Sequence, residues 1–475
     1  MSVNIVWLRR DLRISDNPAL LAASKSGNPL LPIFILDRET EGLGAAFKWR
    51  LGLSLEKLDE SLRKLGTRLV LLRGEPLEVL RKLVTTYKAK KIFWNRLYDQ
   101  DSIKRDTHIK SFFEVRGIPV SSYEGMLMLS PWKLKTNSGS FYKVFTPFWR
   151  ALAREEIEQA LPSPSKMVSP QEWPKSEKLI DWRLDKDIGK GKVYLIKKVR
   201  VGEEAAKLRF EEFLDKRISQ YYLSRDRLDK VESSNLSENL AYGEISPRQI
   251  WHAVLKIYSL NENNSEMFVR QLAWRDFAWY LCFHCPHILK KNWKSEWDDF
   301  PWTENSDALV RWQRGITGVP IVDAGMRELY VTGRMHNRVR MIVASYLTKH
   351  LLIDWRHGLN WFADCLIDWD PASNALGWQW VAGSGPDASP FFRVFNPELQ
   401  SKKFDPKGVY STKFLKGNSE VQGEAQEYYD MVPKSWRLKK DEYPKMPIFD
   451  LRVGRDRALS AYSDFKKRQN SGVFS

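Results

Sequence analysis

The apolar pattern of this 475-residue chain changes about a third of the way along, and that change limits the folds open to it. In the first third, short β-rich runs alternate with amphipathic stretches such as Ala45–Leu65 and Pro76–Tyr87. The β-rich runs are Val3–Leu8, Leu31–Leu36, Arg68–Leu72, Lys91–Trp94 and Ile118–Tyr123. This order predicts an α/β domain, a parallel sheet with helices on both faces. It is Rossmann-like, but the dinucleotide-binding GxGxxG is missing.

Helical spacing dominates from Val201 onward, which predicts an all-α second domain. Within Asn337–Leu352, one apolar stripe is formed by Val339, Ile342, Val343, Tyr346 and Leu347. Between the two patterns, Leu161–Lys178 is rich in proline, serine and lysine and indicates a linker. We therefore expect domains at 1–130 and 201–475, joined by an interdomain segment at 131–200, and the last residues read as an ordinary helix.

The charge balance points toward a polyanionic partner. A formal net charge of +17 and a pI near 9.5 favour nucleic acid, although an ordinary basic protein has the same composition. Twenty tryptophans are unusual and fit a large core, stacking platforms or redox chemistry. Composition therefore favours a nucleic-acid-binding or redox protein but does not choose between these functions and an ordinary basic protein.

Three cysteines are too few for a disulfide framework. Cys282, His284 and Cys285 lie in an apolar helical run without a second cysteine pair, which argues against a metal site. Neither a secretory signal nor a membrane-spanning stretch is apparent, so we expect a soluble, cytoplasmic protein with no membrane partner.

The segment Gly333–Pro397 combines rings, arginines and two acids without a sustained period, which is typical of a site. On a helix, Arg338 and Arg340 point to nearly opposite sides. Asp368 and Asp370 precede a proline that can start a helix, and they could be acid/base groups, metal ligands or half of an ion pair. The most physical role is a carboxylate that pairs with Arg340 beside a bound cofactor.

Three further patterns are weaker. Gln271, Trp274 and Arg275 share one helical face, either a site or a partly exposed edge. Ser233–Asn239 can cap a helix or bind phosphate. His336 is most simply a structural histidine.

Taken together and in order, the motifs resemble those of the photolyase/cryptochrome family, and most closely a bacterial cyclobutane-dimer photolyase. The matching stretches are WLRRDLRISDNPAL, GEISPRQ (Gly243–Gln249), WRDF, TGVPIVDAGMREL, TGRMHNRVRM, GWQW and RVFNP. The resemblance covers essentially the whole chain. It implies a lyase that repairs DNA under blue light with a buried FAD, splitting cyclobutane pyrimidine dimers by electron transfer.

The family likeness also implies roles for residues. FAD would be bound by Tyr221, Ser233, Ser234, Leu236, Ser237, Gln271, Arg275, Asn337, Arg340, Asp368, Asp370 and Asn374. Asn374 would face the flavin N5. The lesion and its DNA would contact Gln271, Trp274, Asn337, Arg338, Met341, Trp380 and Arg393, and electrons would reach the flavin through Trp302, Trp355 and Trp378. A flipped dimer suits such a pocket because it stacks and pairs poorly.

Four positions depart from the family pattern. Gln271 stands where these photolyases usually have glutamate, Asn235 where arginine is frequent, and Phe268 where tryptophan is common. Ser102 replaces the glutamate that usually holds a folate antenna, which leaves a second chromophore open among folate, deazaflavin and flavin.

Three other functions compete with dimer repair. The (6-4) photolyases share the glutamine but carry histidines where this chain has Asn337 and Met341. A cryptochrome photoreceptor often has a C-terminal extension, and plant receptors tend to have aspartate in place of Asn374. A basic nucleic-acid binder without a cofactor leaves the tryptophans unexplained. We expect a monomer that binds damaged DNA and needs no metal.

Overall fold

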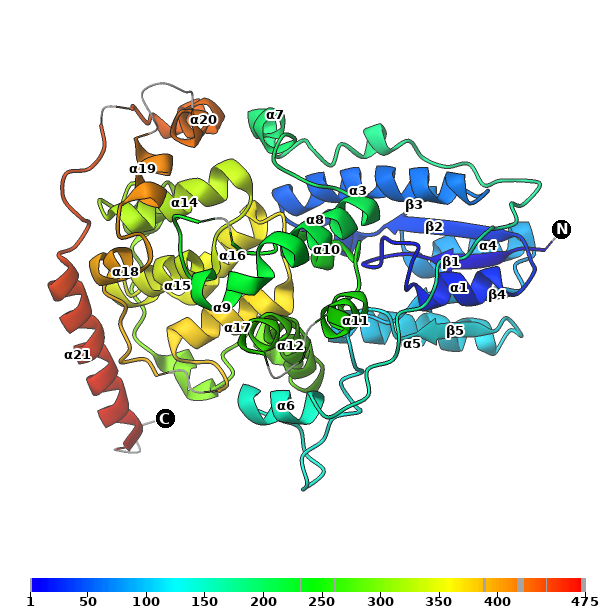
Figure 1. Cartoon of the computed structure of the whole chain (residues 1–475), viewed down its shortest axis with the longest axis horizontal. Helices are drawn as coiled ribbons and strands as arrows, with labels where there is room; N and C mark the ends of the chain where they lie inside the picture. The colour runs from blue at the N-terminus through cyan, green and yellow to red at the C-terminus, as the bar shows by residue number, and fades with distance from the viewer. Residues whose placement is uncertain are drawn as a thin grey trace.

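The computed structural model describes residues 2–230, 232–257, 259, 262–387, 390–416, 423–440 and 442–470. A sheet with its helices occupies one half of the molecule and an assembly of helices the other (Figure 1). We call them the sheet half and the helical half. No helix among the described residues is long and apolar enough to cross a membrane.

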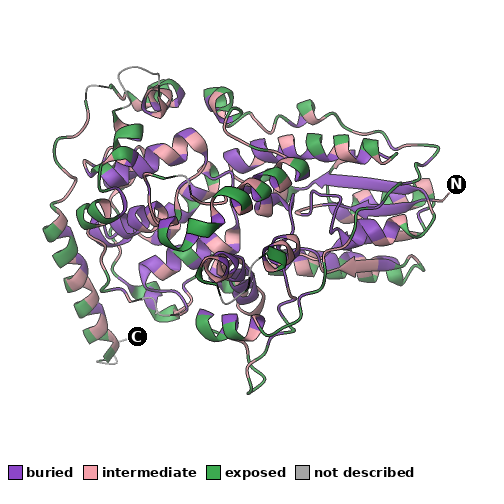
Figure 2. Ribbon diagram, in the orientation of Figure 1, coloured by how far each residue is buried: buried purple, intermediate pink, exposed green. Residues whose placement is uncertain are grey.

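The sheet is parallel throughout, with strand order β3-β2-β1-β4-β5. Its strands are β1 (Asn4–Trp7), β2 (Leu30–Leu36), β3 (Val70–Arg73), β4 (Lys91–Asn95) and β5 (Val120–Tyr123). Every residue of β1 and β2 is buried, as expected for strands covered on both faces (Figure 2). The predicted fold class is confirmed.

Strands β3 and β5 begin two residues later than predicted, and side-chain and helix-end hydrogen bonds explain why. The amide of Leu69 donates to the Asp59 carboxylate at 2.7 Å, so the backbone there is tied to a helix and not to β2. The amide of Ile118 donates to the carbonyl of Phe113 at 3.0 Å, which closes the preceding helix before β5 starts.

Helices cover both faces because successive strand residues point to opposite sides. Val6 packs in a core with α1 (Pro18–Ser24) and α3 (Ala45–Lys64). Ile5 and Trp7 pack in another with α4 (Pro76–Tyr87) and α5 (Gln100–Glu114). Short α2 (Arg38–Glu41) follows β2, and α6 (Phe145–Leu152) leads into the connection.

The predicted linker runs against the sheet half. The carbonyls of Leu161 and Val168 accept from the amides of Asp16 and Leu30, at 3.0 and 2.8 Å. These backbone hydrogen bonds hold the predicted linker in place against the sheet half. The domain division at 1–130, 131–200 and 201–475 stays a prediction.

The helical half is built around long helices with short ones between them. Its helices are α7 (Lys192–Leu195), α8 (Glu203–Lys216), α9 (Tyr221–Ser224), α10 (Ser237–Tyr242), α11 (Pro247–Ile257), α12 (Asn263–His284), α13 (Ser306–Gln313), α14 (Pro320–Thr332), α15 (Asn337–Ser345), α16 (Trp355–Cys365), α17 (Pro371–Ala382), α18 (Pro397–Phe404), α19 (Val409–Leu415), α20 (Glu424–Met431) and α21 (Leu451–Asn470). The expected stripe from Val339 to Leu347 is buried. After α15, the chain continues as one π-helical stretch, η6 (Tyr346–His350).

The halves share a core and buried ionic contacts. Side chains of α1, α3, α14 and α15 pack into one apolar cluster. Arg50 of α3 pairs with Glu244, beyond α10, at 2.8 Å, and both side chains are 0% exposed. Arg248 of α11 pairs with Asp16 at 2.8 Å. The site described next therefore sits on one rigidly packed body.

Candidate functional site

Most of the predicted site residues lie on α12, α15, α17 and the segments just before them. Helices α12 and α17 are tied where α17 begins, because the indole of Trp279 donates to the Asp370 carboxylate at 2.8 Å. Gln271, Trp274 and Arg275 follow one another along α12, and all three are half-buried. The helical-face pattern thus forms a partly open edge.

The ion pair expected between Arg340 and Asp368 is present. One guanidinium nitrogen of Arg340 donates to both carboxylate oxygens of Asp368, at 2.8 and 3.0 Å. The Arg340 Nε donates to the Met335 carbonyl at 2.9 Å, which fixes the plane of the guanidinium. Asp368 is buried, so this pair is a strong, oriented contact of the charge-assisted kind.

Asp370 starts α17. Its Oδ1 accepts from the amide of Ser373 at 2.8 Å, and Pro371 occupies the first turn, as the sequence indicates. The Asn374 side-chain amide donates to the Asp370 carbonyl at 2.9 Å and is buried. Asp370 thus orients both the Trp279 indole and the first turn of α17.

Two residues that the sequence analysis missed contact predicted site residues. Arg225 donates to the Gln271 side chain at 3.3 Å, and Asp226 pairs with Arg338 at 2.6 Å. These partners are 46 and 112 residues apart, so no spacing pattern could reveal them. Asn337, in contrast, is exposed at the start of α15.

His336 is structural. It precedes α15, and its Nδ1 accepts from the Arg338 amide at 3.2 Å while Nε2 meets the Arg225 carbonyl at 2.9 Å. Burial lowers the pKa of the imidazole, so the neutral form is favoured near pH 7. The ring therefore links Arg225 to the start of α15 without carrying charge.

Trp274 is held from behind by an aromatic side chain of α6. The ring of Phe145 stacks on it with centroids 3.6 Å apart and planes 8° from parallel, and the Arg270 guanidinium lies 5.6 Å from the Phe145 ring. Trp380, on α17, lines a small hollow together with Val381, Pro390, Arg393 and Phe395. Phe145 lies 129 residues before Trp274 and gave no sequence signal.

The serine segment fits a phosphate-bearing ligand. Leu236 precedes α10 and offers no side-chain cap, so among the described residues the first amides of that helix are not capped by the residue before it and suit another acceptor. Asn235 adopts the left-handed region (φ 53°), which an asparagine tolerates where the chain turns sharply. Hydroxyls at Ser233, Ser234 and Ser237 surround this turn.

The neighbourhood of that turn is cationic and aromatic. Arg209 donates to the Asn235 carbonyl at 2.8 Å and Arg217 to that of Ser233 at 3.4 Å. Phe268, one of the departures from the family pattern, is buried against Tyr221 at 5.5 Å between ring centroids. Open amides, hydroxyls and arginines fit the diphosphate of a dinucleotide, and the Arg340–Asp368 pair fits the polar edge of its ring system.

The three tryptophans of the expected electron path lie in the same half. A methyl group on Gly358 would come within 2.1 Å of the Trp378 ring, so this indole packs directly on α16, three residues after Trp355. Trp355 is fully buried, and its indole donates to Asn292 at 2.9 Å. The residue after Trp302 bonds to the Leu352 carbonyl at 2.7 Å, which brings Trp302 to the same region.

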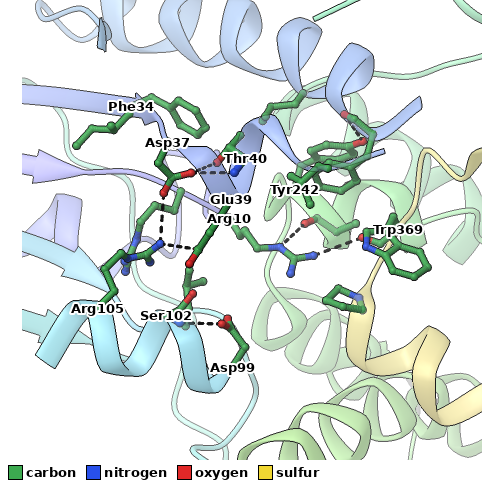
Figure 3. A pocket seen from close by; sticks show the side chains of 18 of the residues that line it. Arg10, Phe34, Asp37, Glu39, Thr40, Asp99, Ser102, Arg105, Tyr242 and Trp369 are labelled. Carbon is green, nitrogen blue, oxygen red and sulfur yellow. Dashed lines mark hydrogen bonds and ion pairs between the residues drawn. The ribbon is translucent and has the colours of Figure 1, made fainter. Parts of the chain in front are cut away.

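A separate cavity of about 200 Å³ lies where the two halves meet (Figure 3). Arg105 pairs there with Asp37 at 3.3 Å and Glu39 at 2.9 Å, and Arg10 donates to the carbonyls of Ala241 and Trp369. Burial lowers the pKa of Arg10 and raises that of Glu39. None of the residues expected to bind flavin lines this cavity.

Ser102 also lines that cavity, from the first turn of α5. Its amide donates to Asp99 at 2.8 Å, as an N-terminal helix cap. The mixture of arginines, acids and rings on the walls suits a flat, polar, conjugated ligand. No group of three histidine, cysteine, aspartate or glutamate residues in the described part of the chain could hold a metal ion.

Comparisons with known proteins identify the family of this chain. Residues 4–165 match the family model described as DNA photolyase, and residues 268–464 the one described as FAD binding domain of DNA photolyase. The chain is 44% identical to a deoxyribodipyrimidine photo-lyase of Agrobacterium fabrum over 98% of both chains. It is 35% identical to cryptochrome-2 of Arabidopsis thaliana, over 86% of this chain and 70% of that protein.

Among solved structures, a bacterial class III photolyase from Agrobacterium tumefaciens superimposes with a TM-score of 0.90 and 42% identity. That match covers 98% of each chain. The FAD-binding half and the sheet half thus occur here in the same order and arrangement as in that enzyme. The chain belongs to the photolyase/cryptochrome family.

Proposed function

We propose that this chain is a deoxyribodipyrimidine photo-lyase, a light-dependent lyase that splits cyclobutane pyrimidine dimers in DNA. One observation carries the proposal beyond the family assignment. The rings expected to flank the lesion, Trp274 and Trp380, stand at the surface edge of α12 and α17. The same two helices carry Gln271, Arg275 and Asn374, which are expected to bind the flavin. Lesion and cofactor would therefore meet across one pair of packed helices.

The cofactor is FAD, and reduced FAD supplies an electron when blue light excites it. The protein's own residues would bind the flavin and fix its orientation. Arg340, kept in plane by Met335 and Asp368, would place positive charge beside the anionic ring system. Open amides and hydroxyls around Ser237 would bind the diphosphate.

At the substrate side, the dimer takes up one electron, its two cyclobutane bonds between the pyrimidines break, and the electron returns. No proton or hydride is consumed in this reaction. Trp274 and Trp380 would stack on the flipped bases, and stacking of this kind contributes about 1–3 kcal/mol per base. Gln271 would hydrogen-bond a pyrimidine edge, oriented by Arg225.

Resting enzyme must be re-reduced after oxidation, and we assign that role to Trp378, Trp355 and Trp302. Their indoles can lose an electron, and the packing of Trp378 on the helix of Trp355 favours transfer between them. Trp378 has a buried indole nitrogen without a hydrogen-bond partner among the described residues. An apolar setting of this kind keeps water away from the charge as it moves.

The decisive experiment is repair of two defined oligonucleotides by the reduced, flavin-loaded protein. One carries a cyclobutane thymine dimer and the other a (6-4) photoproduct. We expect blue light to restore the first and leave the second, and no reaction in the dark. Repair of the (6-4) lesion alone would assign the chain to that enzyme class, and repair of neither would favour a photoreceptor.

A second chromophore belongs in the cavity between the halves. Its walls carry Arg10, Arg105 and Trp369, and Trp369 immediately precedes Asp370, one of the predicted flavin residues. A folate, a deazaflavin or a flavin has the flat ring and polar edge that these groups can bind. We propose that such a pigment collects light there and passes the energy on.

Filling the cavity tests this assignment. Leu43→Trp puts a large ring into the space, whereas Leu43→Met changes its volume little. We expect the first variant to lose the second pigment's absorbance and its contribution to the action spectrum, and the second variant to keep both. Repair by directly excited flavin should persist in each, and pigment retained in Leu43→Trp would place it elsewhere.

Damaged DNA is the partner that this function requires. The net charge of +17 favours binding to phosphates and predicts affinity that falls as salt rises. We further propose that the protein acts as a monomer in the cytoplasm, where it reaches the DNA. Sedimentation of the flavin-loaded protein with and without a damaged duplex measures the stoichiometry.

A further inference from the structure

Lys349 is a buried lysine that the proposed chemistry does not use. It lies in η6 and is 0% exposed. Among the described residues no carboxylate pairs with it, although ionised side chains are seldom buried unless paired. Burial lowers the pKa of the amine well below its usual value. A group this costly needs a compensating contact.

That contact is with the residue that opens an exposed turn. The Lys349 Nζ donates to the carbonyl of Phe391 at 2.7 Å and lies 3.7 Å from the centre of the Phe391 ring. Charged or neutral, the amine can donate to the carbonyl. The same ring packs on Trp297, Phe300 and Tyr462, so Phe391 is firmly anchored.

The other end of the turn is held by the same stretch of helix. The amide of Phe395 donates to the Ser345 hydroxyl at 3.2 Å. Ser345 and Lys349 are four residues apart, across the point where α15 becomes a π-helix and the Leu351 amide reaches back five residues to Tyr346 at 3.0 Å. Single π-turns occur frequently at functional sites. Here one turn of helix clamps both ends of Phe391–Phe395.

The clamped turn presents its middle to solvent. Phe392 is 64% exposed, and Arg393 beside it is exposed too. The amide of Val394 donates to the Phe392 carbonyl at 2.9 Å, which keeps the tip tight. Arg393 lines the same hollow as Trp380, so the tip stands next to the proposed lesion edge.

We propose that Lys349, assisted by Ser345, is a positioning residue for lesion binding: it holds the turn Phe391–Phe395 so that Phe392 and Arg393 meet the DNA beside the flipped dimer. The inference rests on the proposed function. Lys349 touches neither DNA nor flavin. Its effect passes entirely through the turn.

The test compares Lys349→Met with a neighbour on the same helical stretch. Thr348→Val is the matched control, because Thr348 is equally buried and its hydroxyl donates to the Ala344 carbonyl within the helix. Affinity for a duplex with one thymine dimer is measured in the dark, next to flavin content, melting temperature and repair at saturating DNA. We expect Lys349→Met to bind the lesion about tenfold more weakly, as for the loss of one strong hydrogen bond.

Repair per bound lesion and flavin content should equal those of the parent, and Thr348→Val should bind normally. The same substitution is then made in a Phe392→Ala/Arg393→Ala background, where a positioning role predicts no further loss. An equal loss in that background, or a loss shared with Thr348→Val, would show that Lys349 only stabilises the fold.

Should Lys349→Met not fold, Ser345→Ala removes only the second clamp and should show the same pattern with a loss of about threefold, as expected for one neutral hydrogen bond. Unchanged affinity in Ser345→Ala would then overturn the clamp. A parent that binds damaged and intact DNA equally would refute the proposed function itself. A selective parent with an unaffected Lys349→Met would refute the positioning role alone.

Discussion

The sheet half and the helical half gather functional side chains in different ways. In the sheet half, Trp7, Asp37 and Ser102 reach the cavity from strand ends or the helix turns that follow them, where a parallel sheet places such groups. In the helical half, Arg340, Asp368 and Gln271 meet their partners only because helices distant in sequence pack together. A sheet therefore offers a site by its topology, whereas a helical assembly must build one contact by contact.

The two halves also differ in how they treat charge. The cavity keeps three arginines and three acids near water-accessible space. The proposed flavin site places Asp368 and Asn374 in nearly dry surroundings with fixed partners. We interpret the first as adaptable binding of a replaceable pigment and the second as rigid binding of the reacting group.

The largest expected effect tests the redox role of the helical half. Trp378→Phe, on α17, keeps an aromatic ring packed against α16 but removes the oxidisable indole, so photoreduction of oxidised flavin should fall to background. Repair by chemically reduced enzyme should stay near the parent rate. Trp361→Phe, on α16, is the control. Photoreduction at the parent rate in Trp378→Phe would remove this residue from the path.

The next test asks whether the halves are energetically separate. Arg50→Met leaves Glu244 buried without its cation, and breaking such a pair costs about 3–5 kcal/mol. Urea unfolding followed through the sheet-half and helical-half tryptophans should show both shifting together. Glu244→Gln in the same chain should restore part of the stability, and a shift confined to one half would mean that they unfold independently.

A smaller effect is expected at the lesion edge. Trp274→Ala removes one stacking surface and should weaken lesion binding by about 1–3 kcal/mol, with the flavin spectrum unchanged. Affinity for a dimer-containing duplex, measured by titration in the dark, reports it. Trp132→Ala, an exposed indole outside the proposed site, should bind as the parent does. If Trp274→Ala and Trp132→Ala bind the lesion with equal affinity, the lesion pocket does not lie on α12.

The smallest effect concerns pH and the seam between the halves. Asp276 of α12 accepts from the Met128 amide at 2.7 Å, and burial raises its pKa to about 7. The folded state therefore holds a proton that the unfolded chain has lost, so the contribution to stability is full below about pH 4 and is lost as pH rises through 7. In the parent, the free energy of unfolding should fall between pH 4.5 and pH 8. Asp276→Asn should reduce this fall by on the order of 2 kcal/mol.

Much of the fold could be predicted because local patterns suffice for it. The bounds of α4 agree with the sequence analysis to the residue, since a proline starts that helix and its apolar face is regular. Strand β3 begins later than predicted, because the Asp59 carboxylate accepts a hydrogen bond from the Leu69 amide. That bond depends on a helix folded elsewhere in the chain. Local signals determine elements; long-range hydrogen bonds adjust their ends.

The site followed the same rule. The family resemblance pointed to Arg340, Asp368 and Trp274, because residue type and motif order can be read locally in the sequence. Arg225, Asp226 and Phe145 escaped notice, since each acts through a partner far away in the chain.

The sequence by itself thus determined the two architectures, the family and the chemical kinds of side chain at the site. Only the tertiary structure decided that Asp226 faces Arg338, that Phe145 backs Trp274 and that a buried lysine holds the turn at Phe391. The physical reason is that periodicity and capping act within a few residues. Ion pairs, ring stacks and the contacts of buried amines, in contrast, join distant segments, and the burial that strengthens or penalises them exists only after those segments have packed.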